Sequence, residues 1–213
     1  MKKVVLLFRL TVYLPVGIVN RMEHETSTRH TILVKALDLF SLKGYESASV
    51  QEICDQSGIT KPTLYHHFGS KRGVLDAIIG EYGGAMFSII ERESSYNHDL
   101  VMNLKALTRS LIGFALSNQS FYRLYITLSA AAPETQGYAA YQSLRTGIDG
   151  CIESMFRKAA EDHGNMRGRE KAYSETFQGV VRTWTMLVLN KETQLTDDTL
   201  HAIVHYYMHG IFS

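Results

Sequence analysis

The sequence predicts an all-α protein with an N-terminal three-helix helix-turn-helix head and a helical body. Two short helices flank a glycine turn between residues 49 and 68, and later segments repeat apolar residues at helical spacing. Only one proline, Pro133, follows the head. With 213 residues, 45% of them hydrophobic and 20% charged, the composition is that of an ordinary soluble globular protein. The two cysteines, Cys54 and Cys151, lack Cys-x-x-Cys spacing, so we expect reduced thiols.

The N-terminal segment superficially resembles a signal peptide or a membrane anchor, because two lysines precede an apolar run. Arg9 and Pro15 interrupt this run, and eleven residues separate Arg9 from Arg21, whereas a membrane helix needs about 20. We expect residues 1–27 to be an extension that is disordered or not translated, with Met22 as a possible start. A functional membrane segment is the alternative.

The first helix is expected over residues 28–43, where Ile32, Leu33, Ala36, Leu37 and Phe40 recur at helical spacing. Gly44 ends it. Its apolar stripe is expected to pack behind the next two helices, with Leu64 and Phe68 completing the small core.

Residues 49–68 contain, in order, the sequence signals of a helix start, a turn and a second helix start. Ser49 and Glu52 have the spacing of a capping box at the start of a helix over residues 50–57. Gly58 suits a left-handed turn, Thr60 can cap a second helix, and Pro62 lies in its first turn. Such a helix-turn-helix places its second helix in the major groove of DNA.

This segment resembles the DNA-binding segment of the TetR/AcrR family of bacterial transcriptional regulators. The resemblance covers residues 29 to 75 and implies a DNA-binding head followed by a helical body that binds an effector and dimerises. Cys54 and Ser57 stand where the family more often has Ala. The matching residues are Ser49-Val50-Gln51-Glu52-Ile53, Ser57-Gly58-Ile59-Thr60, Thr63-Leu64-Tyr65-His66-His67-Phe68, Ser70-Lys71 and Val74-Leu75.

The candidate DNA contacts lie on and around the second helix. Because net charge is only +1, DNA binding must depend on local charge, and no acid interrupts residues 60–72. Short polar side chains at the start of that helix can meet base edges or a phosphate, while the resemblance implies backbone contacts further along and a phosphate anchor at Lys71. The expected DNA-binding set is Ser49, Thr60, Lys61, Pro62, Thr63, Tyr65, His66, His67 and Lys71.

The body is expected to be helical over residues 76–213, after a head over residues 28–75. A helix over residues 71–96 joins the two and is interrupted by Gly80, Gly83 and Gly84, which could let it bend. Further helices are expected over residues 99–117, 120–131, 133–163, 170–190 and 197–212.

The last two helices carry apolar stripes, and the resemblance implies that they form a four-helix dimer interface. Two heads one helical turn or more apart are also needed to bind a near-palindrome specifically. The alternative is that these stripes are internal core. The expected interface residues are Phe177, Val181, Trp184, Val188, Leu200, Val204, Tyr207 and Ile211.

An effector pocket is implied by the resemblance, and aromatic residues of the middle helices are its candidates. Such a set suits a flat or amphipathic effector, although aromatic residues at helical spacing more often form core. The candidate lining residues are Met86, Phe87, Phe114, Phe121, Tyr122, Tyr125, Tyr138, Tyr141 and Trp184.

Metal, cofactor and catalytic signals are weak. His201, His205 and His209 repeat every four residues, but no Cys or carboxylate joins them at ligand spacing, so interface or solvated histidines are favoured over a metal site. The sequence has no P-loop, dinucleotide-binding loop or nucleophile elbow, and we expect neither an enzyme nor a cofactor.

The sequence therefore favours a cytoplasmic, homodimeric, ligand-responsive regulator, most simply a repressor, that binds a double-stranded operator without a membrane. The alternative is a membrane-tethered or helical protein-interaction scaffold.

Overall fold

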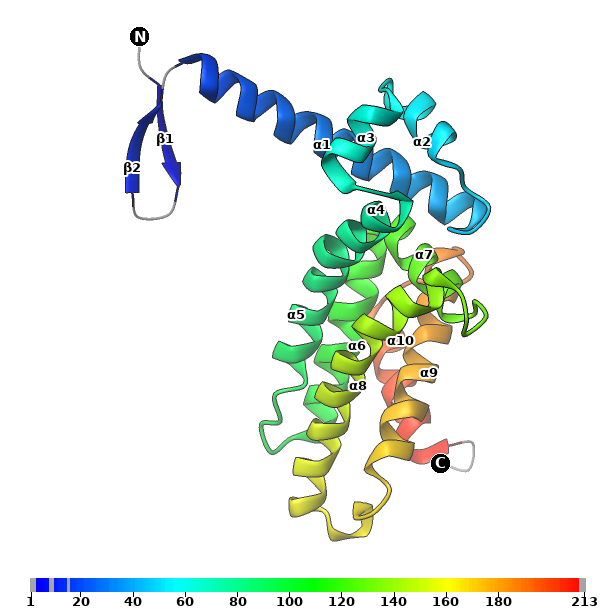
Figure 1. Cartoon of the computed structure of the whole chain (residues 1–213). Coiled ribbons are helices and arrows are strands. Elements are labelled where there is room, and N and C mark those ends of the chain that lie inside the picture. The colour runs from blue at the N-terminus through cyan, green and yellow to red at the C-terminus, as the bar shows by residue number, and fades with distance from the viewer. Residues whose placement is uncertain (1–2, 8–9, 15, 211–213) are drawn as a thin grey trace. The chain divides into compact units, whose positions relative to one another are not determined.

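The computed structural model of this chain describes the backbone of residues 3–7, 10–14 and 16–210, and the side chains of residues 27–210. The chain divides into two compact units, Met1–Ala77 and Ile78–Ser213. Figure 1 shows that helices dominate both units, as the sequence predicts. The division lies close to the expected boundary after residue 75.

The first unit begins with elements that sequence analysis did not predict. Strands β1 (Lys3–Leu7) and β2 (Leu10–Leu14) pair antiparallel, with Lys3 opposite Leu14. β1 contains Val4 and Val5, and β2 contains Thr11, Val12 and Tyr13; β-branched and aromatic residues favour extended backbone. Helix α1 (Val16–Lys43) starts well before the expected Thr28, because no proline interrupts the sequence after Pro15. Whether residues 1–27 are an untranslated extension stays a prediction.

Three short helices complete the head: α2 (Val50–Ser57), which packs on α1, α3 (Lys61–Phe68), which packs on α2, and α4 (Lys71–Ile78). Phe68 is only half-buried, with the guanidinium of Arg29 5.2 Å from its ring centroid, so it contributes less to the core than expected. The buried residues of the head are Ile32, Leu33, Ala36, Leu37, Leu39, Phe40, Tyr45, Ala48, Ile53, Cys54, Leu64, Val74 and Leu75.

The second unit is a helical bundle in which α8 packs against α5, α7 and α9, and α6 packs against α5, α9 and α10. The α4 helix continues through a π-helical turn, η1 (Ile79–Gly83), into α5. Figure 1 shows α5, α6, α8 and α9 running along the length of this bundle. The helices are α5 (Gly84–Glu93), α6 (Leu100–Ser117), α7 (Gln119–Ser129), α8 (Gln136–Asp162), α9 (Glu170–Leu189) and α10 (Asp197–His209), with a 3₁₀ turn η2 (Gly164–Met166) before α9.

Glycines allow close approach where α8 crosses the η1–α5 segment. A Cβ atom added to Gly83 would lie 2.9 Å from Leu144 Cδ2, and one added to Gly147 would lie 2.9 Å from Phe87 Cε2. Both distances are too short for ordinary contact. Gly83, expected only to let the connecting helix bend, therefore also serves helix packing.

Among the described residues, one helical run, Lys71–Glu93, is long and apolar enough to cross a membrane by length and composition alone. Core helices of water-soluble proteins pass the same test. Met86 and Ile90 of this run are buried within the second unit, where α5 packs against α6 and α8. The apolar character of the run is explained by this packing.

Candidate DNA interface and effector cavity

The helix-turn-helix has the caps that the sequence predicts. Ser49 N–H donates to Glu52 Oε2 at 2.9 Å, and Ser49 Oγ accepts from the Glu52 N–H at 3.2 Å, which confirms the capping box. Gly58 has φ +65°, confirming the left-handed turn, and Ile59 N–H donates to the Cys54 carbonyl at 3.0 Å. The start of α3 is therefore held in a defined direction relative to α2.

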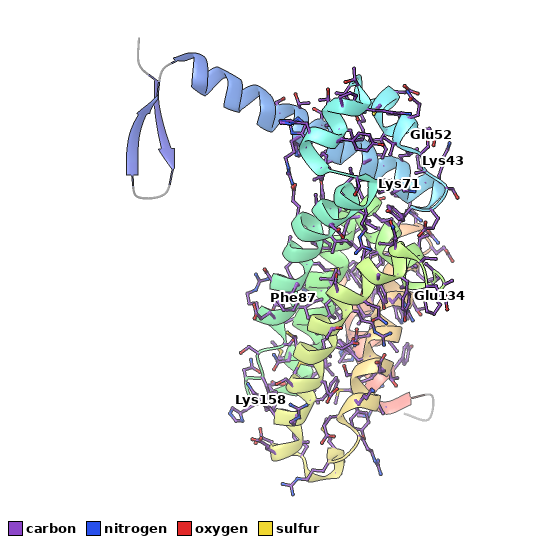
Figure 2. All side chains as sticks on the ribbon, viewed as in Figure 1. Lys43, Glu52, Lys71, Phe87, Glu134 and Lys158 are labelled. Atoms are coloured by element: carbon purple, nitrogen blue, oxygen red, sulfur yellow. The ribbon has the colours of Figure 1, made fainter. Side chains whose placement is uncertain are left out.

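A salt bridge from α1 reinforces this cap. Lys43 Nζ donates to Glu52 Oε1, and Figure 2 shows these two side chains next to each other. The hydrogen bond from Lys43 and then those from Ser49 lower the pKa of Glu52 to about 2. One carboxylate thus joins the end of α1 to the beginning of α2.

The first turn of α3 presents polar groups to solvent. Thr60, Lys61 and Pro62 are exposed and Thr63 is half-buried. Thr60 Oγ1 and Thr63 Oγ1 lie 2.9 Å apart, so the two hydroxyls bond to each other instead of capping the helix backbone. The hydroxyls can donate to a phosphate or accept from a base edge, whereas the Lys61 ammonium can only donate, to a phosphate or to an acceptor on a base.

A hollow of about 530 Å³ adjoins this turn. Sequence analysis missed its contribution from α1, although Ser27, Thr28 and Thr31 form a visible group of hydroxyl residues. Thr31 Oγ1 donates to the Ser27 carbonyl at 2.9 Å, so its lone pairs can still accept a hydrogen bond. The residues that line it are Ser27, Thr28, Thr31, Ser57, Gly58, Ile59, Thr60, Thr63 and His67.

The remaining candidates on α3 are accessible to different extents. Tyr65 has 46% of its surface exposed, which favours an available phenol over a core residue. His66 is exposed and His67 half-buried, with ring centroids 5.3 Å apart. Their DNA contacts stay predictions, as does that of Ser49, whose oxygen already serves the cap.

Lys71 does not have the position of a free phosphate anchor. Its ammonium donates to the carbonyls of Tyr45 at 3.0 Å, Glu46 at 3.3 Å and Ala48 at 2.9 Å, and lies 4.4 Å from the Tyr45 ring centroid. Because an ammonium has three N–H donors, all are used within the head. Lys71, labelled in Figure 2, therefore stabilises the loop between α1 and α2.

The second unit contains a cavity of about 230 Å³. Of the nine sequence candidates, Met86, Tyr122, Tyr125 and Tyr141 line it. The lining is completed by Ile90, Leu111, Ser129, Arg145, Ile148, Ile152, Glu175, Phe177, Gln178, Gly179, Val181 and Arg182.

The other five candidates lie elsewhere. Phe121 is fully buried against Phe114 and Tyr82, with ring centroids 6.0 and 5.6 Å away. Phe87 packs over Gly147, as described above. Trp184 packs on a cluster of Ile112, Val188 and Ile203, and Tyr138 is bonded to Gln142. Aromatic spacing could not separate cavity from core, because both require the same inward-facing positions.

Sequence analysis missed the charged lining. Arg145 donates to Asp149 at 2.9 Å and to Glu175 at 3.0 Å, and Gln178 donates to Asp149 at 3.1 Å. The i,i+4 spacing of Arg145 and Asp149 was the available signal. Arg182 also lines the cavity; it is an exposed residue of α9 and forms no ion pair with any described residue, so its guanidinium can bind an anionic group.

The tyrosines of the cavity stay neutral and can donate hydrogen bonds. Burial raises the pKa of Tyr122, Tyr125 and Tyr141, while the charge of Arg182 opposes this rise at Tyr122 and Tyr141. The rings of Tyr125 and Tyr141 lie with centroids 5.3 Å apart. The cavity combines apolar walls, phenolic donors and a cation.

A larger hollow of about 700 Å³ lies where the start of α6 meets α9 and α10. It is lined by His98, Asp99, Leu100, Val101, Leu104, Phe156, His163, Asn165, Met166, Ala172, Tyr173, Thr176, Tyr207 and Met208.

The expected dimer residues require a correction. Phe177, Val181, Val188, Leu200 and Val204 are buried inside the unit, at most 6% exposed, so a second copy cannot contact them there. Their stripes face the unit's own α6 and α8, because a helix stripe packs first on its own bundle.

Three expected dimer residues differ from that group. Trp184 and Tyr207 are half-buried, and the Tyr207 hydroxyl donates to the Tyr173 carbonyl at 2.9 Å. Ile211 lies outside the described residues. Tyr206 and Met208 of α10, which were not predicted, are 58% and 41% exposed.

Comparison with known proteins supplies independent findings. Residues 32–78 match the family described as bacterial regulatory proteins, tetR family. The chain is 25% identical over 150 residues to the transcriptional activator FasR of Mycolicibacterium smegmatis, covering 68% of this chain and 64% of FasR, which is less than two thirds of that protein. It is 28% identical over 146 residues to the negative transcriptional regulator IcaR of Staphylococcus aureus, covering 63% and 75%.

A solved structure gives the fold. The transcriptional regulator FadR of Bacillus subtilis, in complex with stearoyl-CoA, superposes with a TM-score of 0.69 at 14% identity, covering 85% of this chain and 98% of FadR. At this identity the similarity applies to the fold alone.

Proposed function

Because the chain belongs to the TetR family of bacterial regulatory proteins, we propose that it is a ligand-responsive transcriptional regulator that binds a near-palindromic operator as a homodimer. One observation carries the DNA-binding part: a capped helix-turn-helix presents the polar first turn of α3 to solvent. This is the geometry in which a second helix enters the major groove. It is not a feature that a protein-interaction scaffold needs.

The structure changes the set of residues that we propose to contact DNA. Thr60, Lys61 and Thr63 approach base edges or phosphate, and Tyr65 and His66 lie along the exposed side of α3. Arg29 joins them as an exposed cation beside Phe68. Lys71 is left out of the proposed DNA contacts, because its three N–H donors already bond to backbone carbonyls of the head.

The test is selection from sheared genomic DNA at about 50 and about 200 mM salt, followed by sequencing of the bound fragments. We expect a few fragments that share an inverted repeat, enriched at both salt concentrations. Uniform recovery at low salt with none at high salt would contradict an operator-specific regulator, and no recovery at either would favour the scaffold.

Repression is the proposed sign of regulation. A dimer that covers a promoter excludes polymerase without any further contact surface, which makes repression the simplest outcome. IcaR is a negative regulator, whereas FasR is an activator. Because operators lie on the bacterial chromosome, the protein would act in the cytoplasm.

The effector is proposed to bind in the cavity lined by Tyr122, Tyr125, Tyr141 and Arg182. Its volume is below the range of about 300–1,000 Å³ that drug-sized ligands occupy, which favours a small molecule. Apolar walls beside Arg182, whose guanidinium forms no ion pair with any described residue, favour an amphipathic acid whose anionic group meets that guanidinium. The stearoyl-CoA bound to FadR is also an amphipathic anion.

Effector binding would release the DNA by favouring a dimer whose heads no longer match successive major grooves. The experiment is displacement of the operator by a panel of small aliphatic and aromatic carboxylates. Arg182→Gln should retain operator affinity and lose at least about tenfold in effector response. Arg157→Gln, on the exposed surface of α8, is the matched control, and Thr176→Val tests the larger hollow. Loss of response only in Thr176→Val would place the effector in that hollow instead.

A further inference from the structure

The effector cavity and the larger hollow follow one another along the helices of the second unit. Leu104 of α6 and Tyr173 of α9 line the hollow, and residues later in both helices line the cavity. Helix α8 runs in the opposite direction (Figure 1), and there the order is reversed: Ile152 lines the cavity and Phe156, one turn later, lines the hollow. Three helices therefore agree that the two spaces lie end to end.

Phe177 of α9 lies between these two spaces. Its side chain lines the cavity and is fully buried. Its ring also packs on Phe156 and Tyr207, with ring centroids 6.3 and 5.3 Å away, and both of these residues line the hollow. The centroids of Phe156 and Tyr207 are 6.3 Å apart, so the three rings contact one another. They form an aromatic wall, and Phe177 is the ring of this wall that borders the cavity.

The distance between this wall and the anion-binding group of the cavity is short. Arg182 follows Phe177 by five positions on α9, which is about 7.5 Å along the helix axis. Ile148, Ile152 and Val181 are buried and supply an aliphatic lining. An acid whose carboxylate meets Arg182 therefore has room for an apolar chain of only a few carbon atoms before the chain reaches Phe177.

We propose that Phe177 limits the length of the ligand that the cavity binds, because its ring closes the cavity toward the hollow. This inference rests on the effector cavity of the proposed function, and it narrows the ligand to acids with a short chain. A longer chain would have to displace a buried ring that packs on two others, and protein interiors are packed too closely for this to occur without cost. A smaller side chain at this position should make room for a longer ligand.

The test is calorimetric titration of the full chain with butanoate, hexanoate, octanoate and dodecanoate. Wild-type affinity should rise with chain length until the cavity is filled and then fall. Phe177→Leu should move the optimum to a longer acid and increase the affinity for dodecanoate relative to hexanoate by about tenfold or more, because further methylene groups become buried. Phe177→Met keeps most of the volume in a flexible chain, so it should fold even if the leucine variant does not, and should move the optimum in the same direction.

Phe121→Leu is the matched control. Phe121 is as fully buried as Phe177, but it packs on Phe114 and Tyr82 instead of bordering either space. This variant should lose stability to a similar extent and keep the wild-type optimum of chain length.

An unchanged optimum in the Phe177 variants, an equal shift in Phe121→Leu, or binding of none of these acids would overturn the inference. Release of labelled operator by the same acids is measured in parallel to separate the two proposals. Acids that bind with an optimum set by residue 177 but release no operator would support the inference and contradict the effector role of the cavity. Operator release by short acids with the same optimum in all variants would remove only the role of Phe177.

Discussion

At the scale of single residues, the head depends on contacts that motif matching does not reveal. Gly73, in the first turn of α4, has no room for a side chain, since an added Cβ would lie 1.9 Å from the Phe68 carbonyl oxygen. Lys71 gives its three donors to carbonyls of the preceding loop. Gly73 lets the start of α4 lie close to the end of α3, and Lys71 joins the start of α4 to the loop between α1 and α2.

Gly73→Ala should destabilise the head by about 3 kcal/mol, because a backbone atom cannot move away as a flexible side chain can. Gly113→Ala, in α6 with nothing within 4 Å of the added Cβ, should be neutral or stabilising by up to about 1 kcal/mol. Chemical denaturation followed by circular dichroism measures both. Equal stability of the two variants would show that α4 shifts freely.

Lys71→Ala should lower the stability of the protein, whereas Lys61→Ala should lower its affinity for DNA. Removing the Lys71 ammonium takes away three hydrogen bonds to carbonyls of the preceding loop and should cost about 2 kcal/mol of stability. Removing the exposed Lys61 should leave the melting temperature unchanged and reduce the slope of log affinity against log salt by about 1. If Lys71→Ala instead reduced the slope of log affinity against log salt and left the stability unchanged, Lys71 would be a phosphate contact after all.

At the scale of elements, the start of α2 is held by a charged cap. Glu52 accepts from Ser49 and from Lys43, and these bonds exist only in the folded head. Its pKa falls from 4.5 to about 2 on folding. A carboxyl whose folded pKa is lowered stabilises the protein above its unfolded pKa, and this contribution is lost as pH falls toward the folded value.

Glu52→Gln should therefore be less stable than the wild type at pH 6, and the difference should shrink between pH 4.5 and about 2. Melting temperatures across this range provide the measurement. Glu134→Gln, exposed in the loop before α8 and labelled in Figure 2, is the matched control. A difference from wild type that is constant with pH would mean that the cap works without its charge.

At the scale of the whole molecule, specificity requires two heads at a set separation. One α3 covers too short a half-site, so the proposed homodimer binds two half-sites on one face of the DNA. The surface that joins the two copies is not formed by the buried stripes of α9 and α10, which belong to each unit's own core. We propose that exposed positions on these helices form it instead.

Inserting about 5 base pairs between the half-sites should reduce affinity to that of a single half-site, because half a helical turn places one half-site on the opposite face of the DNA. Inserting about 10 base pairs should return both half-sites to the same face of the DNA and recover part of the affinity. Fluorescence anisotropy with labelled operators distinguishes these cases. Full affinity after the shorter insertion would mean that each head binds independently.

The sequence alone determined the helix-turn-helix, because its signals are local. A capping box, a left-handed glycine and a proline in the first turn act within a few residues, and the structure confirms the first two at Ser49 and Gly58. Helical periodicity likewise predicted the body helices to within a few residues of their observed ends.

Only the tertiary structure decided what each inward side chain does. Tyr141 lines a cavity and Phe121 fills core, although both recur at helical spacing with the same aromatic chemistry. Lys71 binds carbonyls more than twenty residues away, and Arg182 becomes a cavity cation only because α9 packs on α8. Periodicity states which side of a helix faces inward. Whether that side meets a neighbour, a cavity or a second copy depends on distances between segments far apart in the chain.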